Sequence, residues 1–177
     1  MTPRHPPAIR RGFPDSTGAE SRPDFEPSNG MEERQMGTLK EKVYRLNAAV
    51  NDHDLNPIGD MYAADAELVW PGLGPTKGRE AVVGFYATLL GAFPDVHVTI
   101  KRILEEGDAV AIQYVSEGTH TGPLPMPTGE LPPTNRRFTI EASSFGLVDA
   151  NGLIKTQREY FDQVEILAQL GSMPAPA

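Results

Sequence analysis

The sequence predicts an α+β domain in which a curved antiparallel sheet wraps around N-terminal helices. Between residues 38 and 93 the apolar residues recur every three to four positions, which is the spacing of a helix. From residue 96 to residue 161 they alternate with polar residues, which is the spacing of half-buried strands. Helices packed into the hollow of such a sheet leave a deep pocket suited to a small molecule.

Helices are predicted over residues 38–51, 54–62 and 79–93, with a short strand over 67–70. Thr38 and Glu41 form a capping box at the start of the first helix. Asp54 caps the second helix, and Pro57 lies in its first turn, where a proline is tolerated. The third helix follows Gly78 and stops before Pro94.

Four strands are then predicted over residues 96–104, 109–121, 138–148 and 153–161, followed by a helix over 164–170. Turns at 106–108 and 149–152 connect two pairs of these strands as hairpins. A proline-rich loop, residues 122–134, interrupts the middle of the sheet. Gly171 provides the glycine that commonly ends a helix.

Residues 1–36 differ from the rest in holding six prolines, five arginines, six acids and almost no aliphatic side chains. Such a segment cannot bury enough apolar surface to offset the entropy of ordering it. We therefore expect a disordered tail over 1–36, a domain over 37–172 and a disordered end over 173–177. Met31 and Met36 are alternative starting points for the chain.

Composition excludes several classes of protein. A net charge of −8 argues against nucleic-acid binding, and the absence of cysteine excludes disulfides, thiolate nucleophiles and cysteine-ligated zinc. The sequence has no glycine-rich nucleotide loop and no histidine pair at metal-binding spacing, so we expect neither a cofactor nor a metal. No membrane span or signal peptide is predicted, which indicates a cytoplasmic protein.

Asp162 is the first candidate for chemistry. Strand alternation puts Arg158, Tyr160 and Asp162 on one face and Glu159 and Phe161 on the other, which we expect to be the outer face. If the first face looks into the pocket, loss of water raises the pKa of the Asp162 carboxyl toward a value useful for proton transfer. Alternatively, Asp162 caps the final helix.

His120, at the end of a strand, is the second catalytic candidate, since an imidazole there can polarise a ketone or pass a proton to Asp162. Alternatively, it only holds the proline-rich loop in place. Arg158 can bind a substrate carboxylate, keep Asp162 ionised or form a simple ion pair. The substrate-binding candidates are Tyr44, Trp70, Phe85, Tyr86, Phe138, Arg158 and Tyr160.

Five short motifs occur in a fixed order. They are Phe93-Pro94-Asp95, Glu105-Glu106-Gly107-Asp108-Ala109-Val110, Gly118-Thr119-His120-Thr121-Gly122, Pro132-Pro133-Thr134-Asn135-Arg136-Arg137, and Tyr160-Phe161-Asp162 seven residues before Gln169-Leu170-Gly171. With this order of elements, residues 38–171 resemble the SnoaL-like polyketide cyclases of the nuclear-transport-factor-2-like superfamily. These proteins are cone-shaped α+β barrels, and the same scaffold carries many activities.

The resemblance implies a cofactor-independent cyclase, isomerase or lyase acting on a polyketide-like or other enolisable hydrophobic molecule. It assigns Asp162 as the general acid/base of an aldol ring closure, with His120 as its partner. The loop 123–131 is longer than in the family pattern and Asn135 replaces a glycine, so substrate specificity is expected to differ.

Two other functions remain open. One is a non-catalytic domain that binds a small molecule or a partner. The other is an epoxide hydrolase of the same superfamily, an activity that the resemblance links to an Asp–Arg–Asp arrangement. No Arg-x-Asp occurs on a single predicted strand, which counts against it. The exposed face of the sheet carries apolar residues, which indicates a homodimer.

Overall fold

The computed structural model describes residues 32–126 and 129–173. Most of the predicted tail, residues 1–31, and of the predicted C-terminal end, residues 174–177, lies outside this range. Residues 32–36, which precede the expected helix start at Thr38, form the beginning of a helix. They are Glu-Glu-Arg-Gln-Met, all good helix formers, so the helix extends beyond the capping signal at Thr38.

The described elements follow one another as α1 (Glu32–Asn51), α2 (Leu55–Asp60), β1 (Tyr62–Val69), β2 (Thr76–Lys77), α3 (Arg79–Ala92), β3 (His97–Glu106), β4 (Ala109–Thr119), β5 (Leu124–Met126), β6 (Gly129–Leu131), β7 (Arg137–Val148), β8 (Ile154–Tyr160) and α4 (Gln163–Gln169). This order matches the predicted one. The additions are β2 and the small hairpin of β5 and β6, which lies within the proline-rich loop.

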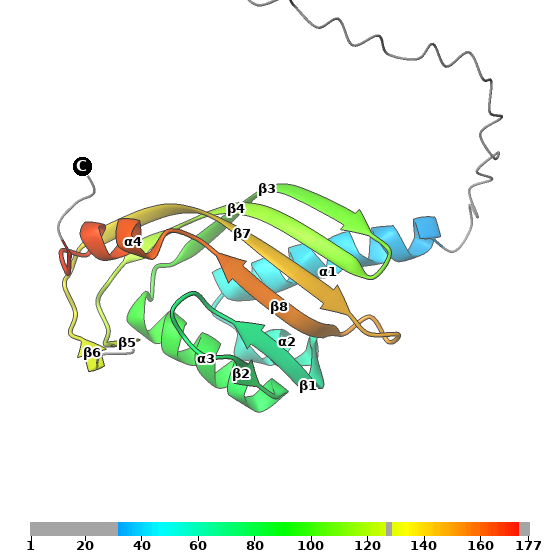
Figure 1. Ribbon diagram of the computed structural model, residues 1–177, viewed down its shortest axis with the longest axis horizontal. Coiled ribbons are helices and arrows are strands. Elements are labelled where there is room, and N and C mark those ends of the chain that lie inside the picture. The colour runs from blue at the N-terminus through cyan, green and yellow to red at the C-terminus, as the bar shows by residue number, and fades with distance from the viewer. Residues whose placement is uncertain (1–31, 127–128, 174–177) are drawn as a thin grey trace, which may run out of the picture.

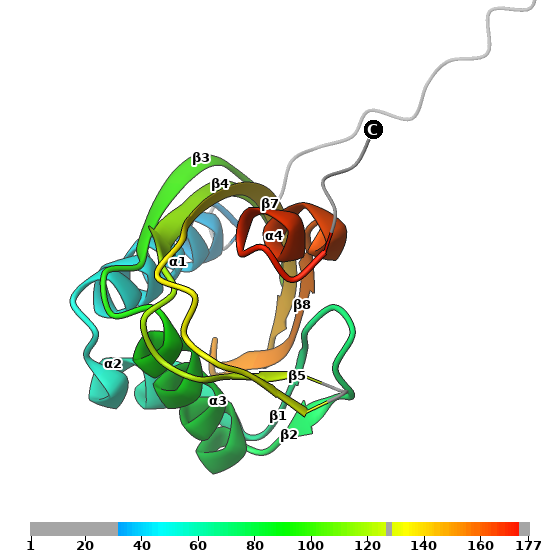
Figure 2. The same ribbon diagram turned by 90° about the vertical axis from the view of Figure 1, so that its left-hand side faces the viewer.

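The main sheet has the strand order β2-β1-β8-β7-β4-β3. All its neighbouring pairs are antiparallel except β1 and β8, which run parallel although they lie far apart in the sequence. The sheet curves strongly, as the end-on view shows (Figure 2). The α+β class with a curved sheet is therefore confirmed.

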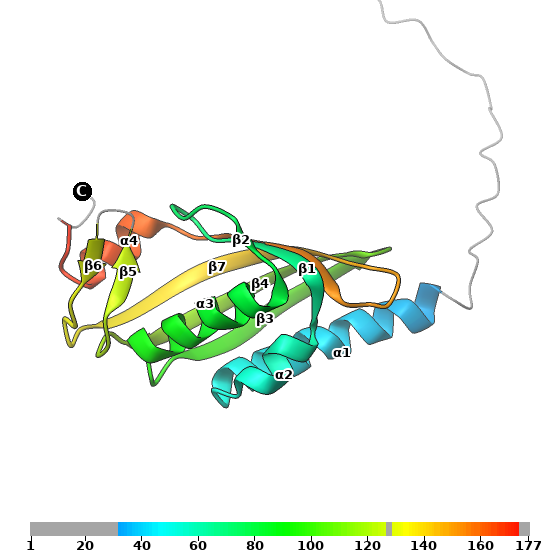
Figure 3. The ribbon, with the colours of Figure 1, turned by 90° about the horizontal axis from the view of Figure 1, so that it is seen from below.

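Helices α1, α2 and α3 lie together on the concave side of the sheet (Figures 1 and 3). α1 contacts β3, and α3 contacts β1 and α2. Their apolar sides join the sheet in one core, whose most completely buried members include Ile58, Tyr62, Leu68, Val82 and Phe93. No helix in the described ranges is long and apolar enough to cross a membrane.

At three helix ends, the capping residue or glycine that the sequence predicted lies where it was expected. Asp54 caps α2 by accepting a hydrogen bond from the Asn56 backbone N–H at 3.1 Å. Gly78 precedes α3 with φ of 88°, and Gly171 follows α4 with φ of 76°. Both values lie in the left-handed region that favours glycine.

Strand β7 fixes which side chains face the interior. Its residues alternate between exposed and buried, so Phe138, Ile140, Ala142 and Ser144 point inward. In the β7–β8 ladder Ser144 lies opposite Glu159, and directly paired residues share a face of the sheet. Glu159 therefore faces the interior, contrary to our expectation that it lies on the outer face.

Candidate functional site

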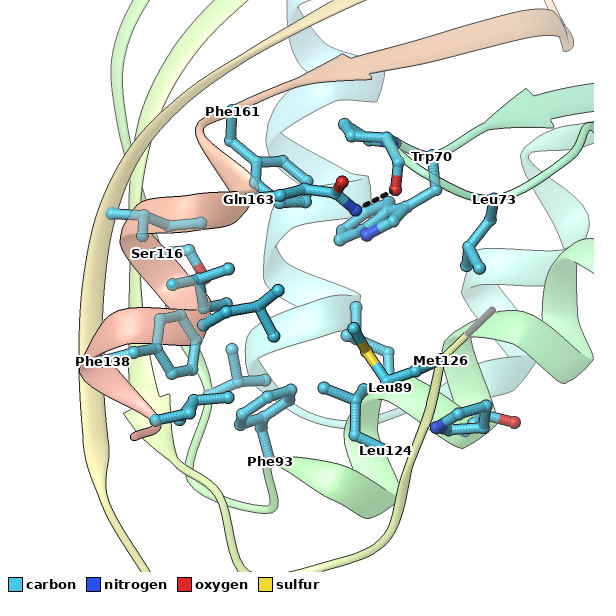
Figure 4. Close-up of a pocket in the computed structure, with 18 of the residues that line it drawn as sticks. Trp70, Leu73, Leu89, Phe93, Ser116, Leu124, Met126, Phe138, Phe161 and Gln163 are labelled. Atoms are coloured by element: carbon cyan, nitrogen blue, oxygen red, sulfur yellow. Dashed lines mark hydrogen bonds between the residues drawn. The ribbon is translucent and has the colours of Figure 1, made fainter. Parts of the chain in front are cut away.

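The concave side of the sheet holds a cavity of about 270 Å³, with walls that are almost entirely apolar. Its lining includes Trp70, Leu73, Phe85, Leu89, Phe93, Leu124, Met126, Phe138, Phe161 and Leu170. The side chains labelled in Figure 4 surround this space from α3, from α4 and from the β5–β6 hairpin. Among those labelled, only Ser116 and Gln163 carry a side-chain oxygen.

Aromatic contacts hold the walls of this cavity. The Trp70 ring lies 5.0 Å from the ring of Phe85 and 5.2 Å from that of Phe161, measured between centroids. Both distances are typical of favourable tilted or edge-to-face pairs. The Gln163 side chain donates a hydrogen bond to the Pro71 carbonyl oxygen at 2.5 Å, which ties the start of α4 to the loop after β1 (Figure 4).

A second cavity of about 100 Å³ lies against α1 and the middle of the sheet. We call it the inner cavity because the buried Glu159 lines it, and we call the first one the outer cavity. The inner cavity shares five lining residues with the outer cavity: Trp70, Leu89, Val96, Tyr114 and Ser116. The two cavities are therefore adjacent parts of one hollow. Most of the polar side chains of this hollow line the inner part: Asn47, Tyr86, Ser144, Gln157 and Glu159.

The inner cavity contains a buried carboxyl group. Glu159 is 5 % exposed, and its two oxygens accept hydrogen bonds from different donors. The Tyr114 hydroxyl donates to Oε2 at 2.6 Å, and the Gln157 amide Nε2 donates to Oε1 at 2.5 Å. Carboxyl groups are rarely buried without such partners, so these two hydrogen bonds are what allows Glu159 to lie in the interior.

Two more tyrosines extend this network. The Tyr62 hydroxyl donates to Oε1 of Gln157 at 2.5 Å and lies 3.0 Å from the Tyr86 hydroxyl. Since the Gln157 amide oxygen accepts from Tyr62, its NH₂ group is oriented toward Glu159. The hydrogen bonds from Tyr62 to Gln157 and from Gln157 to Glu159 therefore fix the position of the Glu159 carboxyl.

Burial raises the pKa of Glu159 above its ordinary value of 4.5, and hydrogen bonds from Tyr114, Gln157 and Ser144 partly oppose this rise. Burial also raises the pKa of Tyr86 to about 12, and it raises the pKa of Tyr62 and of Tyr114. These tyrosines are therefore hydrogen-bond donors at neutral pH. Glu159 is the group whose proton is most readily gained or lost.

Asp162 occupies a different position from the one that we expected of a catalytic acid. Its side chain is exposed and accepts hydrogen bonds from the backbone N–H groups of Val164 at 2.8 Å and Glu165 at 3.2 Å. It is the N-cap of α4, which was the alternative interpretation of this residue. The expectation of an enclosed Asp162 is wrong because β8 directs its odd-numbered side chains inward.

His120 is fully buried but lines neither the outer nor the inner cavity. Its Nδ1 accepts a hydrogen bond from the Thr134 N–H at 3.3 Å and lies 3.1 Å from the Thr134 hydroxyl. Its backbone pairs with Asn135 and Arg136, and burial lowers its pKa. This geometry matches the alternative in which His120 holds the proline-rich loop.

The remaining substrate-binding candidates divide into two groups. Trp70, Phe85 and Phe138 line the outer cavity, and Trp70 and Tyr86 line the inner one. Tyr44, Arg158 and Tyr160 are exposed and line neither, so their expected place in the pocket is wrong. For Arg158 and Tyr160 the reason is again strand alternation, which puts them on the convex face of the sheet.

Sequence reasoning did not select Glu159, Gln157, Tyr114, Ser116 or Ser144. The sequence held one indication of the buried face. Gln157, Glu159 and Phe161 alternate onto the same side of the strand, and Phe161 is the apolar residue next to the final helix. Each face of this strand carries both polar and apolar side chains, so the alternation alone does not indicate which face is buried. Across the described ranges, no three His, Asp or Glu side chains gather closely enough to hold a metal ion.

Comparisons with known proteins agree with this architecture. IdmH of Streptomyces antibioticus, described as a proposed polyketide cyclase, is 30% identical, with a TM-score of 0.62 over 75% of this chain and 98% of that one. A proposed SnoaL-like polyketide cyclase from a Jannaschia species is 17% identical, with a TM-score of 0.67 over 88% of this chain and 99% of that one.

An LEH-like epoxide hydrolase of M. tuberculosis shares the fold at 18% identity, with a TM-score of 0.61 over 77% of this chain and 91% of that one. No curated protein matches the sequence. The family model described as SnoaL-like polyketide cyclase matches residues 41–170, which is most of the chain. The chain therefore belongs to the SnoaL-like polyketide cyclase family.

Proposed function

We propose that this protein is a cofactor-independent enzyme that moves a proton on an enolisable hydrophobic small molecule, with Glu159 as the general acid/base. Ring closure and isomerisation are reactions of this kind. The observation that carries the proposal is one buried carboxyl with a raised pKa at the inner end of an apolar hollow. A carboxyl whose pKa approaches the working pH is an efficient proton carrier.

The proposed step begins with removal of a proton from the carbon next to a substrate carbonyl. Glu159 accepts this proton, and the negative charge develops on the carbonyl oxygen. Ser116 lines both cavities and can offer its hydroxyl group to that oxygen. In a ring closure, the carbanion then bonds to a second carbonyl carbon, and Glu159 returns its proton to the new alkoxide.

Glu159 takes the role that the resemblance gave to Asp162, for a physical reason. Asp162 already uses its carboxylate oxygen to cap α4 and faces solvent. It therefore lacks the loss of water that raises the pKa of Glu159. In this proposal Gln157 is a positioning residue, since it holds one carboxyl oxygen through its oriented amide.

The test is proton exchange on a simple ketone. A decalone is incubated with the protein in heavy water, and deuterium uptake next to the carbonyl is followed by mass spectrometry. We expect Glu159→Gln to lower the exchange rate by about a hundredfold or more, because the amide cannot accept the proton. Asp162→Asn is the matched control and should stay within about twofold of the wild type.

Exchange by Glu159→Gln at the wild-type rate would remove Glu159 from the mechanism. Loss of exchange in the Asp162→Asn variant, with an unchanged melting temperature, would restore Asp162 as the acid/base. No exchange by the wild-type protein above background would favour the alternative of a binding domain without catalysis.

Epoxide hydrolysis is less well supported as the reaction. The resemblance links that activity to an Asp–Arg–Asp arrangement. Among the described residues that line the outer and inner cavities, Glu159 is the one carboxylic acid and arginine is absent.

We also propose that two copies of the chain pair through the convex face of the sheet. Phe145 and Tyr160 are 45% and 54% exposed on this face, and Leu104 is 62% exposed. Leu104 and Phe145 both pair with Ala111, so they lie in one row across three strands. Exposed apolar side chains in contiguous positions favour an association surface.

A further inference from the structure

A third cavity, of about 40 Å³, lies between α1 and strands β4, β7 and β8. Five of its described lining residues also line the inner cavity: Val43, Leu46, Ile112, Ser144 and Gln157. None of its described lining residues lines the outer cavity. Figure 1 shows α4, β5 and β6 at one end of the sheet and the turn between β7 and β8 at the other. The three cavities therefore form a row, with the inner cavity and Glu159 in the middle.

Polar side chains lie at both ends of the third cavity. Ser144 lies opposite Glu159 in the β7–β8 ladder and forms a hydrogen bond with its carboxyl group. At the other end, Lys42 of α1 donates a hydrogen bond from Nζ to the carbonyl oxygen of Gly152, in the turn between β7 and β8. Lys42 is only half-buried, so this end of the cavity lies close to solvent. The cavity thus leads from the partners of Glu159 toward the outside.

The volume of the third cavity suits water and excludes a larger ligand. A water molecule takes up roughly 30 Å³ in the liquid, and an apolar cavity that holds benzene measures roughly 150 Å³. A cavity of about 40 Å³ therefore has room for a water molecule and none for a ring. A buried water needs about two to four polar partners. Ser144, Gln157 and Lys42 provide such partners in the lining of the cavity.

Gly146 keeps the third cavity open. It occupies an inward-facing position of β7 and lines this cavity alone among the three. Its backbone lies outside the left-handed region, so its conformation does not require glycine. Glycine weakens the interior of a strand and often marks a place where a ligand comes close to the backbone. Apart from its chain neighbours, a Cβ built there would meet the Val110 side chain and the Thr156 carbonyl oxygen, each at 3.4 Å, so alanine fits and projects into the cavity.

We propose that the third cavity is a water site through which Glu159 exchanges its proton with solvent while a ligand fills the outer cavity. An apolar ligand there displaces the water on its own side of Glu159. The proton of the Glu159 carboxyl passes to the Ser144 oxygen as the Ser144 hydroxyl proton passes to the water, which releases a proton to solvent beside Lys42. Each transfer breaks one O–H bond and forms another, so no further reactant is needed. The exchange route rests on the proposed function, whereas the water site follows from the cavity itself.

The water site is tested by crystallography at high resolution. We expect an ordered water within hydrogen-bond distance of the Ser144 hydroxyl in the wild type, and its loss in Gly146→Ala. A dry third cavity in the wild type would overturn the proposal, whether or not the protein is an enzyme. A water that stays in place in the alanine variant would overturn it as well, because Gly146 would then not shape the site.

The exchange route is tested by isotope transfer during an isomerisation in heavy water. The probe is a β,γ-unsaturated octalone, a two-ring ketone that becomes a conjugated ketone when a proton moves from its α carbon to its γ carbon. Ultraviolet absorbance of the product gives the rate of proton transfer. Deuterium at the γ carbon, measured by NMR, reports whether Glu159 exchanged its proton before returning it. Saturation with the probe is followed by the fluorescence of Trp70, the single tryptophan of the sequence, which lines the outer and inner cavities.

We expect most of the wild-type product to carry deuterium at the γ carbon. Gly146→Ala should lower the deuterated fraction by about threefold or more and keep the rate within about twofold, because Gly146 does not line the part of the hollow that holds the probe. Gly84→Ala is the matched control. It adds the same methyl group at an exposed position of α3, outside all three cavities, and should change neither quantity.

Ser144→Ala breaks the route at its first step without filling the cavity, so its product should also carry less deuterium. This second variant keeps the test decisive if Gly146→Ala fails to fold. Wild-type product without deuterium at the γ carbon would overturn the exchange route. An unchanged deuterated fraction in both variants would overturn it too, since solvent would then reach Glu159 past the ligand.

Failure of the proposed function gives a different result. A wild-type protein that does not isomerise the octalone contradicts Glu159 as an acid/base, and the crystallographic experiment then decides the water site alone. A Gly146→Ala variant that loses rate while its deuterated fraction stays constant shows that the methyl group disturbs catalysis and not exchange, which contradicts the route.

Discussion

The two faces of β8 differ sharply in exposure over its last four residues. Glu159 points into the hollow and is 5% exposed, whereas Tyr160, the next residue, points outward and is 54% exposed. In the same way, Gln157 is buried and Arg158 is exposed. A single step along a strand therefore separates a buried carboxyl from a solvent-facing surface.

The carboxyl groups of Glu159 and Asp162 extend this comparison. They are three positions apart in the chain, yet Glu159 accepts hydrogen bonds from side chains in the interior, and Asp162 accepts them from backbone N–H groups at the start of a helix. The same functional group can thus serve chemistry at one position and helix capping at the other. The comparison teaches that the surroundings of a carboxyl, more than its type, assign its role.

The largest effect on stability is expected from Tyr114→Phe, which removes the hydrogen bond to Oε2 of Glu159. A hydrogen bond to a charged, buried group contributes about 1.5–3 kcal/mol. The phenyl ring keeps the packing of the tyrosine, so the loss measures the bond. Tyr44→Phe, at an exposed tyrosine, is the control and should leave the free energy of unfolding unchanged.

The pH dependence of this effect has a defined sign. Burial raises the folded pKa of Glu159 above 4.5, so wild-type stability falls as the pH rises from about 4.5 through the folded pKa, and then levels off. The hydrogen bond from Tyr114 favours the ionised carboxylate and so lowers the pKa of Glu159. Its removal should therefore reduce the free energy of unfolding little at acid pH and most above the folded pKa. The other titratable groups facing Glu159 are Tyr62 and Tyr86, which stay neutral over this range.

Urea unfolding of Tyr114→Phe at about pH 4.5 and pH 8 checks the prediction. An equal loss at both pH values would show that Glu159 does not ionise in this range. The Glu159→Gln variant should lack the fall in stability with pH that the wild type shows.

The next effect is expected on the convex face. Phe145→Glu places a charge in the middle of the proposed dimer surface, opposite Ala111 and Arg158 in the two flanking ladders. Loss of a central aromatic contact typically weakens an interface by about 2 kcal/mol, or roughly thirtyfold in the dimer Kd. Analytical ultracentrifugation over a range of concentrations measures it.

Phe145→Leu is the matched control for this experiment and should keep most of the association. A wild-type chain that sediments as a monomer at every concentration, or a Phe145→Glu variant with unchanged dimer affinity, would contradict the proposed surface. Neither substitution touches the hollow, so decalone binding should stay constant throughout.

The smallest effect is expected at Asp162. Asp162→Ala removes the N-cap of α4 and should lower the free energy of unfolding by about 1 kcal/mol, measured by thermal or urea unfolding. Asp162→Asn should lose less, because an asparagine side chain caps helices nearly as well. A much larger loss would mean that Asp162 contributes more than the two backbone hydrogen bonds described for it.

Local sequence signals predicted much of the fold. The capping residue Asp54 and the glycines at 78 and 171 stand where helices begin or end, because such preferences depend on only a few neighbouring residues. The start of α1 was misplaced because the residues before Thr38 also favour a helix. The parallel pairing of β1 with β8 was not foreseen, because it joins segments far apart in the chain.

The site was predicted only in part. The apolar walls at Trp70, Phe85 and Phe138 follow from composition and spacing, since large apolar side chains are buried in most folds. The acid was misassigned because Gln157 and Glu159 look like solvent-facing residues until the pairing of β7 with β8 turns them inward.

By itself, the sequence determined the class of fold, the order of its elements and the caps at their ends, since each depends on residues close together in the chain. Only the tertiary structure decided which face of β8 is enclosed, and thereby which carboxyl loses its water. The physical reason is that strand register and sheet curvature are set by contacts between distant segments.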